Sequence, residues 1–123
     1  MACRISELVI KCRDPRRLAA FWCEVLGFTV LETDYGAVAA LPPEGFGGSQ
    51  PTLVFIPTTE PTVGGLPLHF DVNATDRNQD AELERLLELG ARPADIGQTG
   101  EESWHVLVDP EGNEFCLLRT RLS

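Results

Sequence analysis

The sequence lacks any apolar run close to the about 18 residues that a membrane-spanning helix needs. Its first residues also lack the hydrophobic segment of a secretory signal. Basic residues are scarce, since ten Lys and Arg stand against 19 Asp and Glu, for a net charge of −9. Nucleic acids and anionic membranes attract clustered basic side chains, so this balance argues against both as partners. We expect a cytoplasmic protein whose partners are small molecules, cations or other proteins.

The four cysteines show no Cys-x-x-Cys spacing, and three of them lie in apolar, periodic segments. Without an export signal, such cysteines are expected to be buried thiols rather than a disulfide framework. The length of 123 residues is that of one domain with a single core, and 43% of the residues are hydrophobic, as in ordinary globular proteins.

Pairs of residues recur along the chain at a nearly constant separation. They are Asp14 with Asp76, 62 apart, Gly27 with Gly90, 63 apart, and Glu7 with His69, again 62 apart. Each aspartate follows an apolar run and precedes a helical pattern, and each glycine closes that pattern. The sequence therefore predicts one domain, 1–123, made of two similar modules, 1–62 and 63–123, in a pseudo-twofold arrangement.

The first module is predicted to contain a strand, a helix and three strands. The strand alternates over 5–12, and Asp14-Pro15 is a typical helix start. One helical face carries Leu18, Phe21, Trp22, Val25 and Leu26, and Gly27 ends the helix. The remaining strands are expected over 28–32, 38–41 and 53–56, with a long loop over 42–51.

The second module repeats this order less clearly. Strands are predicted over 66–73, 93–96, 104–108 and 114–118, with a turn at Asp109-Pro110-Glu111-Gly112. A helix between Asp76 and Gly90 carries a leucine stripe, and Glu82, Glu84 and Glu88 are expected to face solvent. Two βαβββ modules predict an α+β fold in which a curved mixed sheet surrounds a cavity and the helices lie outside.

Alternation along the strands predicts a polar stripe on the open face of the sheet. Glu7 and Lys11 fall on one face of the first strand, and His69 and Asp71 fall on the matching face of the second module. Polar residues inside a concave sheet indicate a ligand site. The alternative is that this face is simply solvated. His105 and Cys116 are most simply structural, the latter as a packed thiol.

Three segments of the sequence resemble the vicinal oxygen chelate superfamily, which includes glyoxalase I, extradiol dioxygenases, and fosfomycin and bleomycin resistance proteins. The segments are Glu7–Pro15 with the following Ala20-Phe21-Trp22 and Leu26-Gly27-Phe28, Leu68–Val72, and Asp109–Leu117. The match is closest to glyoxalase-like domains without a known substrate. The resemblance implies the two-module fold, and it makes a homodimer plausible because related domains often share a site between two chains.

The resemblance also implies where a metal would bind. Enzymes of this superfamily hold a divalent ion with His, Glu or Gln at four positions. Carried over, these positions fall on Glu7, on His69, on Cys116 where the family usually has Glu, and near Phe55, which cannot bind a metal. A Glu, His and Cys set suits Zn²⁺, with Ni or Fe as the other candidates, and is poor for Mg²⁺ or Mn²⁺.

Two functions of different kinds follow from these residues. The first is a metal-free small-molecule binding protein, similar to bleomycin resistance proteins, with no cofactor. Its predicted ligand-binding residues are Lys11, Tyr35, Phe46, Asp71 and Trp104. The negative charge favours a cationic ligand, and the 42–51 loop would act as a flap.

The alternative is a metal-dependent lyase, isomerase or dioxygenase of the same superfamily. Its metal would polarise substrate oxygens as a Lewis acid, with Glu7, His69 and Cys116 as ligands. Lys11 or Asp71 would transfer protons. A protein-interaction module that has kept the fold without the chemistry is a third reading, against which the polar stripe argues.

Overall fold

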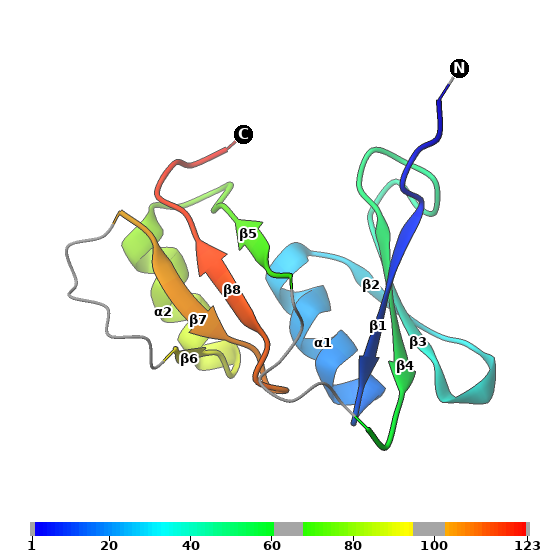
Figure 1. Ribbon diagram of the computed structural model, residues 1–123. Helices are drawn as coiled ribbons and strands as arrows, with labels where there is room; N and C mark the ends of the chain where they lie inside the picture. The colour runs from blue at the N-terminus through cyan, green and yellow to red at the C-terminus, as the bar shows by residue number, and fades with distance from the viewer. Residues whose placement is uncertain (1, 61–67, 95–102, 123) are drawn as a thin grey trace. The chain divides into compact units, whose positions relative to one another are not determined.

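The computed structural model describes residues 2–60, 68–94 and 103–122. The chain forms two compact units, Met1–Pro61 and Thr62–Ser123, and each is described below by itself. Figure 1 shows the elements of both units, coloured from blue at the N-terminus to red at the C-terminus. None of the helices in the described residues is long and apolar enough to cross a membrane.

The first unit is a four-stranded mixed sheet with one long helix. Its elements are β1 (Glu7–Cys12), α1 (Pro15–Leu26), β2 (Thr29–Glu32), the short 3-10 helix η1 (Asp34–Gly36), β3 (Val38–Leu41) and β4 (Thr52–Pro57). The strand order is β1-β4-β3-β2, with β1 parallel to β4 and the other pairs antiparallel. This confirms the predicted βαβββ order of the first module.

Helix α1 begins and ends where the sequence predicts. The Asp14 carboxylate accepts a hydrogen bond from the backbone N–H of Arg17 at 3.2 Å. Pro15 occupies the first turn, where a backbone N–H would have no acceptor within the helix, so its missing N–H costs no hydrogen bond. Gly27 ends the helix in the left-handed conformation, with φ of 71°. The buried face of α1 includes Leu18 and Trp22, whose burial anchors the helix on the sheet.

The second unit repeats the same topology. Its elements are β5 (Phe70–Val72), α2 (Gln79–Leu89), β6 (Arg92–Pro93), β7 (His105–Val108) and β8 (Glu114–Leu117). The strand order is β5-β8-β7-β6, and β5 runs parallel to β8. The second βαβββ order is thus confirmed as well. The strand expected over 66–73 is short, at 70–72, and residues 66–67 and 95–96 of two predicted strands lie outside the described residues.

The pairing of the first strand with the last strand is the same in both units, and corresponding residues are 62 positions apart, as in the sequence repeat. Val9 is paired with Val54 between β1 and β4, and Asp71 is paired with Cys116 between β5 and β8. The first-module counterpart of Cys116 is therefore Val54, which adjoins Phe55 and likewise cannot bind a metal. Because side chains alternate along a strand, Phe55 faces the other way and is fully buried.

A buried aspartate shapes the turn before β8. Asp109 is buried, with only 4% of its surface exposed. Its Oδ1 atom accepts hydrogen bonds from the backbone N–H groups of Glu111 and Asn113, at 2.9 and 3.0 Å, and its carboxylate also contacts the Asn113 amide. Such an Asx turn fixes the path of the chain from β7 into β8, and hence the position of Cys116.

The four cysteines all lie in the described residues, and none of them forms a disulfide. They differ in how deeply they are buried. Cys12 and Cys23 are buried, and Cys116 is partly buried, whereas Cys3 is exposed. Burial, with a smaller effect from the charge of Glu24, raises the pKa of the Cys23 thiol to about 11. Cys23 is therefore an unreactive core thiol, as expected.

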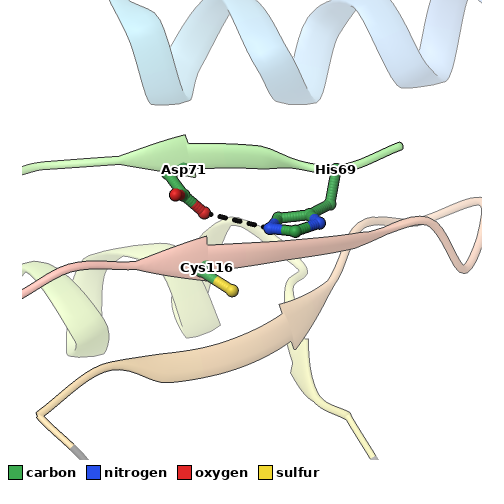
Figure 2. Close-up of side chains that lie close together, drawn as sticks. All are labelled: His69, Asp71 and Cys116. Carbon is green, nitrogen blue, oxygen red and sulfur yellow. Dashed lines mark ion pairs between the residues drawn. The ribbon is translucent and has the colours of Figure 1, made fainter.

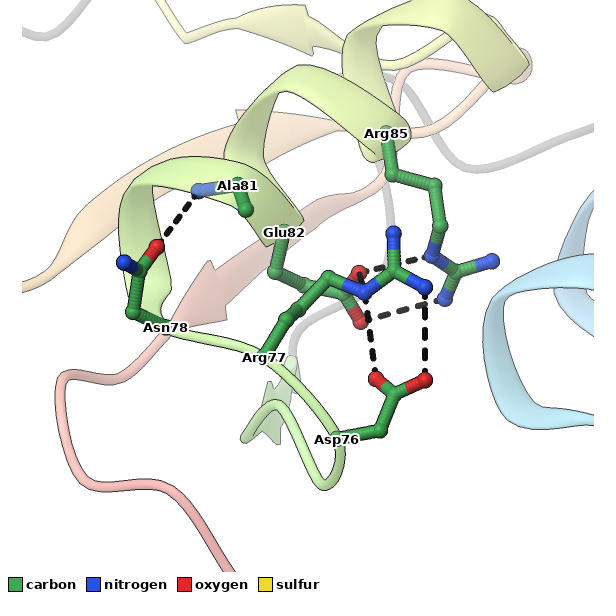
Figure 3. Close-up of polar contacts among 6 residues, drawn as sticks. All are labelled: Asp76, Arg77, Asn78, Ala81, Glu82 and Arg85. Atoms are coloured by element: carbon green, nitrogen blue, oxygen red, sulfur yellow. Dashed lines mark hydrogen bonds and ion pairs between the residues drawn. The ribbon is translucent and has the colours of Figure 1, made fainter.

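Helix α2 lies between Asp76 and Gly90, as predicted. It starts at Gln79, and the Asn78 side chain caps it by accepting a hydrogen bond from the backbone N–H of Ala81 at 2.8 Å (Figure 3). Asp76 lies outside the helix, where its carboxylate accepts two hydrogen bonds from the Arg77 guanidinium, at 3.1 and 3.2 Å. Asn is among the preferred N-cap residues, because its side-chain oxygen accepts a hydrogen bond from an N–H group of the first helical turn.

The expectation that Glu82 faces solvent is wrong. Its side chain is only 10% exposed and accepts hydrogen bonds from the Arg85 guanidinium at 2.6 and 3.1 Å, while Arg77 Nε lies 3.9 Å away (Figure 3). A carboxylate can be buried when a guanidinium pairs with it in this two-pronged way. Leu86 is buried beside it on the same helix, whereas Leu87 of the predicted leucine stripe is 40% exposed.

Replacing Glu82 by Ala is expected to lower the free energy of unfolding by about 2–3 kcal/mol, because the partly buried Arg85 would lose its partner. The matched control is Glu84→Ala on the exposed side of the same helix, expected to change stability by less than about 0.5 kcal/mol. Urea unfolding followed by circular dichroism measures both. Equal effects of the two substitutions would show that the Glu82 pair adds nothing to stability.

Candidate metal centre

His69, Asp71 and Cys116 lie together on the exposed face of the second sheet (Figure 2). His69 directly precedes β5 and Asp71 lies two residues further on, so both side chains project from the same face. Cys116 comes from β8, where it is paired with Asp71. One donor atom of each side chain can be chosen so that all three lie within 4.8 Å of one another.

The three side chains also interact with one another. His69 Nε2 lies 3.2 Å from Asp71 Oδ1, and the two side chains are 55% and 50% exposed. Burial raises the pKa of the Cys116 thiol, and the negative charge of Asp71, a hydrogen bond to Asp71 and the charge of Glu114 raise it further. At neutral pH the thiol is therefore protonated, which makes Cys116 a poor nucleophile by itself.

The donor set fits a borderline divalent cation. It offers one imidazole nitrogen, one carboxylate oxygen and one sulfur, which are the atom types that bind Zn²⁺. Three protein ligands are also the number typical of catalytic zinc sites, in which a fourth position stays open. Mg²⁺ and Ca²⁺ prefer oxygen alone, so a site with a thiol does not suit them. Burial and, to a smaller extent, the neighbouring carboxylates favour the protonated thiol, and a cation at this position would displace that proton.

The first module cannot form an equivalent cluster. With the spacing of 62, the positions that match His69, Asp71 and Cys116 hold Glu7, Val9 and Val54. Glu7 is exposed at the start of β1, and it is the single metal donor among the three matching residues. The metal-binding chemistry of the described residues is therefore concentrated in the second module. The part of Glu7 in metal binding stays a prediction from the sequence.

The predicted ligand-binding residues other than Asp71 are all exposed. Lys11 lies on β1, and Tyr35, 99% exposed, lies in η1 with a positive φ of 63°. Phe46 is 63% exposed in the 42–51 loop, and Trp104 is 43% exposed directly before β7. Lys11, Tyr35 and Phe46 belong to the first unit, and Trp104 belongs to the second. Their binding role stays a prediction.

The sequence predicts Asp71 as a ligand-binding or proton-transfer residue and not as a metal donor. Alternation along the strand is the signal that places Asp71 on the same face as His69. Its position beside Cys116 follows from the β5–β8 register, which the spacing of 62 does not encode.

Replacing Asp71 by Asn in a Cys3→Ala background is expected to speed alkylation of Cys116 by iodoacetamide several-fold at mildly alkaline pH. Removing the carboxylate charge lowers the thiol pKa, and each unit of pKa changes the thiolate fraction about tenfold below the pKa. Mass spectrometry of the labelled peptide against pH measures the rate. In the control Glu114→Gln the increase should be smaller, and an unchanged rate in Asp71→Asn would contradict the assigned interaction.

The family model of the glyoxalase-like domain matches residues 7–118, nearly the whole chain. The chain belongs to this family, and its structural neighbours lie in the glyoxalase, bleomycin resistance and dioxygenase superfamily. This confirms the vicinal oxygen chelate resemblance seen in the sequence. No curated protein matches the chain significantly.

Several solved structures are similar over their full length. The oxidase ChaP-H2 has a TM-score of 0.68 at 16% identity, covering 100% of this chain and 98% of that one. A glyoxalase/bleomycin resistance protein/dioxygenase family enzyme from Burkholderia phytofirmans has a TM-score of 0.65 at 17% identity, covering 94% and 97%. These likenesses show the fold alone.

The fosfomycin resistance protein FosX from Listeria monocytogenes is also similar. A variant of it, in complex with Mn(II) and 1S,2S-dihydroxypropylphosphonic acid, has a TM-score of 0.65 at 14% identity. The alignment covers 96% of this chain and 90% of that one. At least one protein of this fold therefore binds a divalent metal together with a small oxygen-rich molecule.

Proposed function

We propose that His69, Asp71 and Cys116 bind a divalent metal ion, Zn²⁺ in the first place, and that a small oxygen-bearing molecule is bound at the open position of that metal. The observation that carries the proposal is the convergence of three donor atoms of different kinds within 4.8 Å on one sheet face. The exposure of His69 and Asp71 leaves room for solvent or a ligand to reach the ion.

The fold family supports a metal at this place. The neighbouring FosX complex contains Mn(II), and the family resemblance puts metal ligands at the positions of His69 and Cys116. The family usually has Glu where this chain has Cys116. A sulfur donor in place of a carboxylate shifts the preference from oxygen-seeking cations such as Mn²⁺ toward Zn²⁺. The same substitution makes binding dependent on loss of the thiol proton.

A metal bound here would act as a Lewis acid on substrate oxygens. The residues of this chain hold and orient it. His69 supplies a ring nitrogen, and Asp71, 3.2 Å from the His69 ring, fixes the orientation of that ring as well as offering an oxygen. Cys116 gives up its proton on metal binding. A lyase, isomerase or dioxygenase reaction is the activity that we assign to such a centre.

Metal-free binding is the second candidate function. The three side chains have polar partners within the cluster even without an ion, because Asp71 contacts His69 and also accepts a hydrogen bond from the Cys116 thiol. In that case the partly exposed Asp71 carboxylate would attract a cationic ligand. Trp104 of the same unit would supply a further contact, and the binding roles of Lys11, Tyr35 and Phe46 stay predictions from the sequence.

We expect the purified, tag-free protein to take up about one equivalent of Zn²⁺, as in structural and catalytic zinc sites. His69→Ala and Cys116→Ser should abolish this binding, because each removes one of three donors. Asp71→Asn should abolish it if Asp71 binds the ion, and should weaken it about 10–100-fold if Asp71 only orients His69. Isothermal titration calorimetry and elemental mass spectrometry measure the affinity and the content.

The controls use the other residues of the same type. His105→Ala changes the other histidine, which lies on β7 and is paired with Leu117, and Cys3→Ala removes the exposed thiol. Both should retain the metal. Glu7→Ala tests the sequence prediction for the first module. Absence of uptake by the wild-type protein would reject the metal site and favour metal-free binding.

The pKa of Cys116 predicts how metal affinity depends on pH. Because the folded-state pKa is raised, the thiol must lose a proton to bind Zn²⁺, so the affinity should rise with pH up to the thiol pKa. In Cys116→Glu the rise should end at lower pH, and the preference should move from Zn²⁺ toward Mn²⁺. Competition between the two metals at several pH values measures this. An identical pH profile for both proteins would exclude Cys116 as a ligand.

A further inference from the structure

Among the described residues, strand β2 is an edge strand of the first sheet. It is the last strand in the order β1-β4-β3-β2, and all four of its residues are exposed. Val30 and Leu31 are 45% and 49% exposed, although both are large and apolar. Consecutive residues of a strand point to opposite faces, so this edge has apolar side chains on both faces.

The ladder between β2 and β3 shows which backbone groups point outward. The backbone N–H of Thr33 donates to the carbonyl of Ala37 at 3.0 Å, just beyond the pairing of Leu31 with Ala39. In an antiparallel ladder, alternate residues bond to the neighbouring strand. Leu31 therefore shares the orientation of Thr33 toward β3, and the N–H and C=O groups of Val30 and Glu32 point to the open edge.

The matching edge of the second sheet is protected. Strand β6 is the last strand there, and Val30 corresponds to Pro93 at a spacing of 63. The backbone N–H of Ala94 donates to Val106 at 3.0 Å, so position 93 faces outward, where proline has no N–H to offer. An edge with proline and arginine resists pairing with another strand. Strand β2 has neither of these residues.

We propose that β2 pairs with β2 of a second copy of this chain, in antiparallel orientation about a twofold axis at Leu31. In this register Val30 of one copy and Glu32 of the other exchange two backbone hydrogen bonds, and the symmetry repeats them. The two Leu31 side chains then meet at the axis as a closely spaced, non-hydrogen-bonded pair. The register is self-complementary, as a twofold interface requires.

The charges of the chain favour this surface for a second copy. The first unit holds five basic and seven acidic residues, whereas the second unit holds five basic and twelve acidic residues. Two copies therefore repel each other least through their first units. The charge on β2 itself is that of Glu32, and Arg16 Nε lies 2.9 Å from this carboxylate within the same copy. No two like charges face each other in the proposed register.

Sedimentation equilibrium over a concentration series tests the proposal. Wild-type protein should form dimers, and Val30→Pro, which copies the protected edge of the second sheet, should be monomeric at concentrations where wild type is dimeric. Leu31→Arg should also be monomeric, because it places two like charges at the axis. Ile5→Lys, at a 70% exposed apolar residue before β1, is the matched control and should leave the dimer intact.

Cysteine cross-linking tests the register. In a Cys3→Ala background, Leu31→Cys should form a disulfide between two copies on mild oxidation, because paired residues at the axis are close enough for one. Thr29→Cys, which lies opposite Thr33 of the other copy, should not cross-link. A monomeric wild type, a dimer that persists in both Val30→Pro and Leu31→Arg, or equal cross-linking at 29 and 31 would each overturn the proposal.

The substitutions that test the dimer are different from those that test the metal centre. His69, Asp71 and Cys116 belong to the second unit, and Val30 and Leu31 belong to the first. Val30→Pro is expected to retain its metal content, and His69→Ala is expected to remain dimeric. Circular dichroism spectra of each variant establish that it is folded. The cross-linking result keeps the test decisive if Val30→Pro does not fold.

Discussion

The parallel pairing of β5 with β8 is the constraint on which the candidate centre depends. These strands are far apart in the sequence, and their pairing places Asp71 next to Cys116, with His69 one step along the same face. The buried carboxylate of Asp109 supports this pairing, because its hydrogen bonds to the turn determine where β8 begins. Without that fixed register, the side chains of His69, Asp71 and Cys116 would not lie next to one another.

The two modules share one framework and differ in chemistry. Their first and last strands repeat at a spacing of 62, yet His69, Asp71 and Cys116 correspond to Glu7, Val9 and Val54. Their edge strands differ in the same way, since Pro93 in the second module corresponds to Val30 in the first. Backbone pairing tolerates such changes, because it uses the main chain and leaves the outward side chains free to diverge. One module can therefore specialise in binding an ion and the other in contacts with a second copy.

Local signals account for what was predicted well. Asp14-Pro15 and Gly27 define α1 because a cap, a fixed φ and a left-handed residue act within a few bonds of the backbone. The second helix also lies where the sequence predicts it, but its cap, Asn78, was not among the predicted features. The burial of Glu82 depends on Arg85 and on the surrounding chain. No periodicity of apolar residues reveals a paired, buried carboxylate.

Patterns along the sequence were sufficient to predict the two βαβββ modules, the family, and the strand faces on which Glu7, Lys11, His69 and Asp71 lie. Alternation and helix capping are properties of neighbouring residues, so they can be read directly along the chain. Only the folded structure shows that Asp71 lies beside the Cys116 thiol. It also decided that β2 is an edge with outward-pointing backbone groups at Val30 and Glu32. Strand register and strand order are set by pairing between distant segments, and no local pattern encodes them.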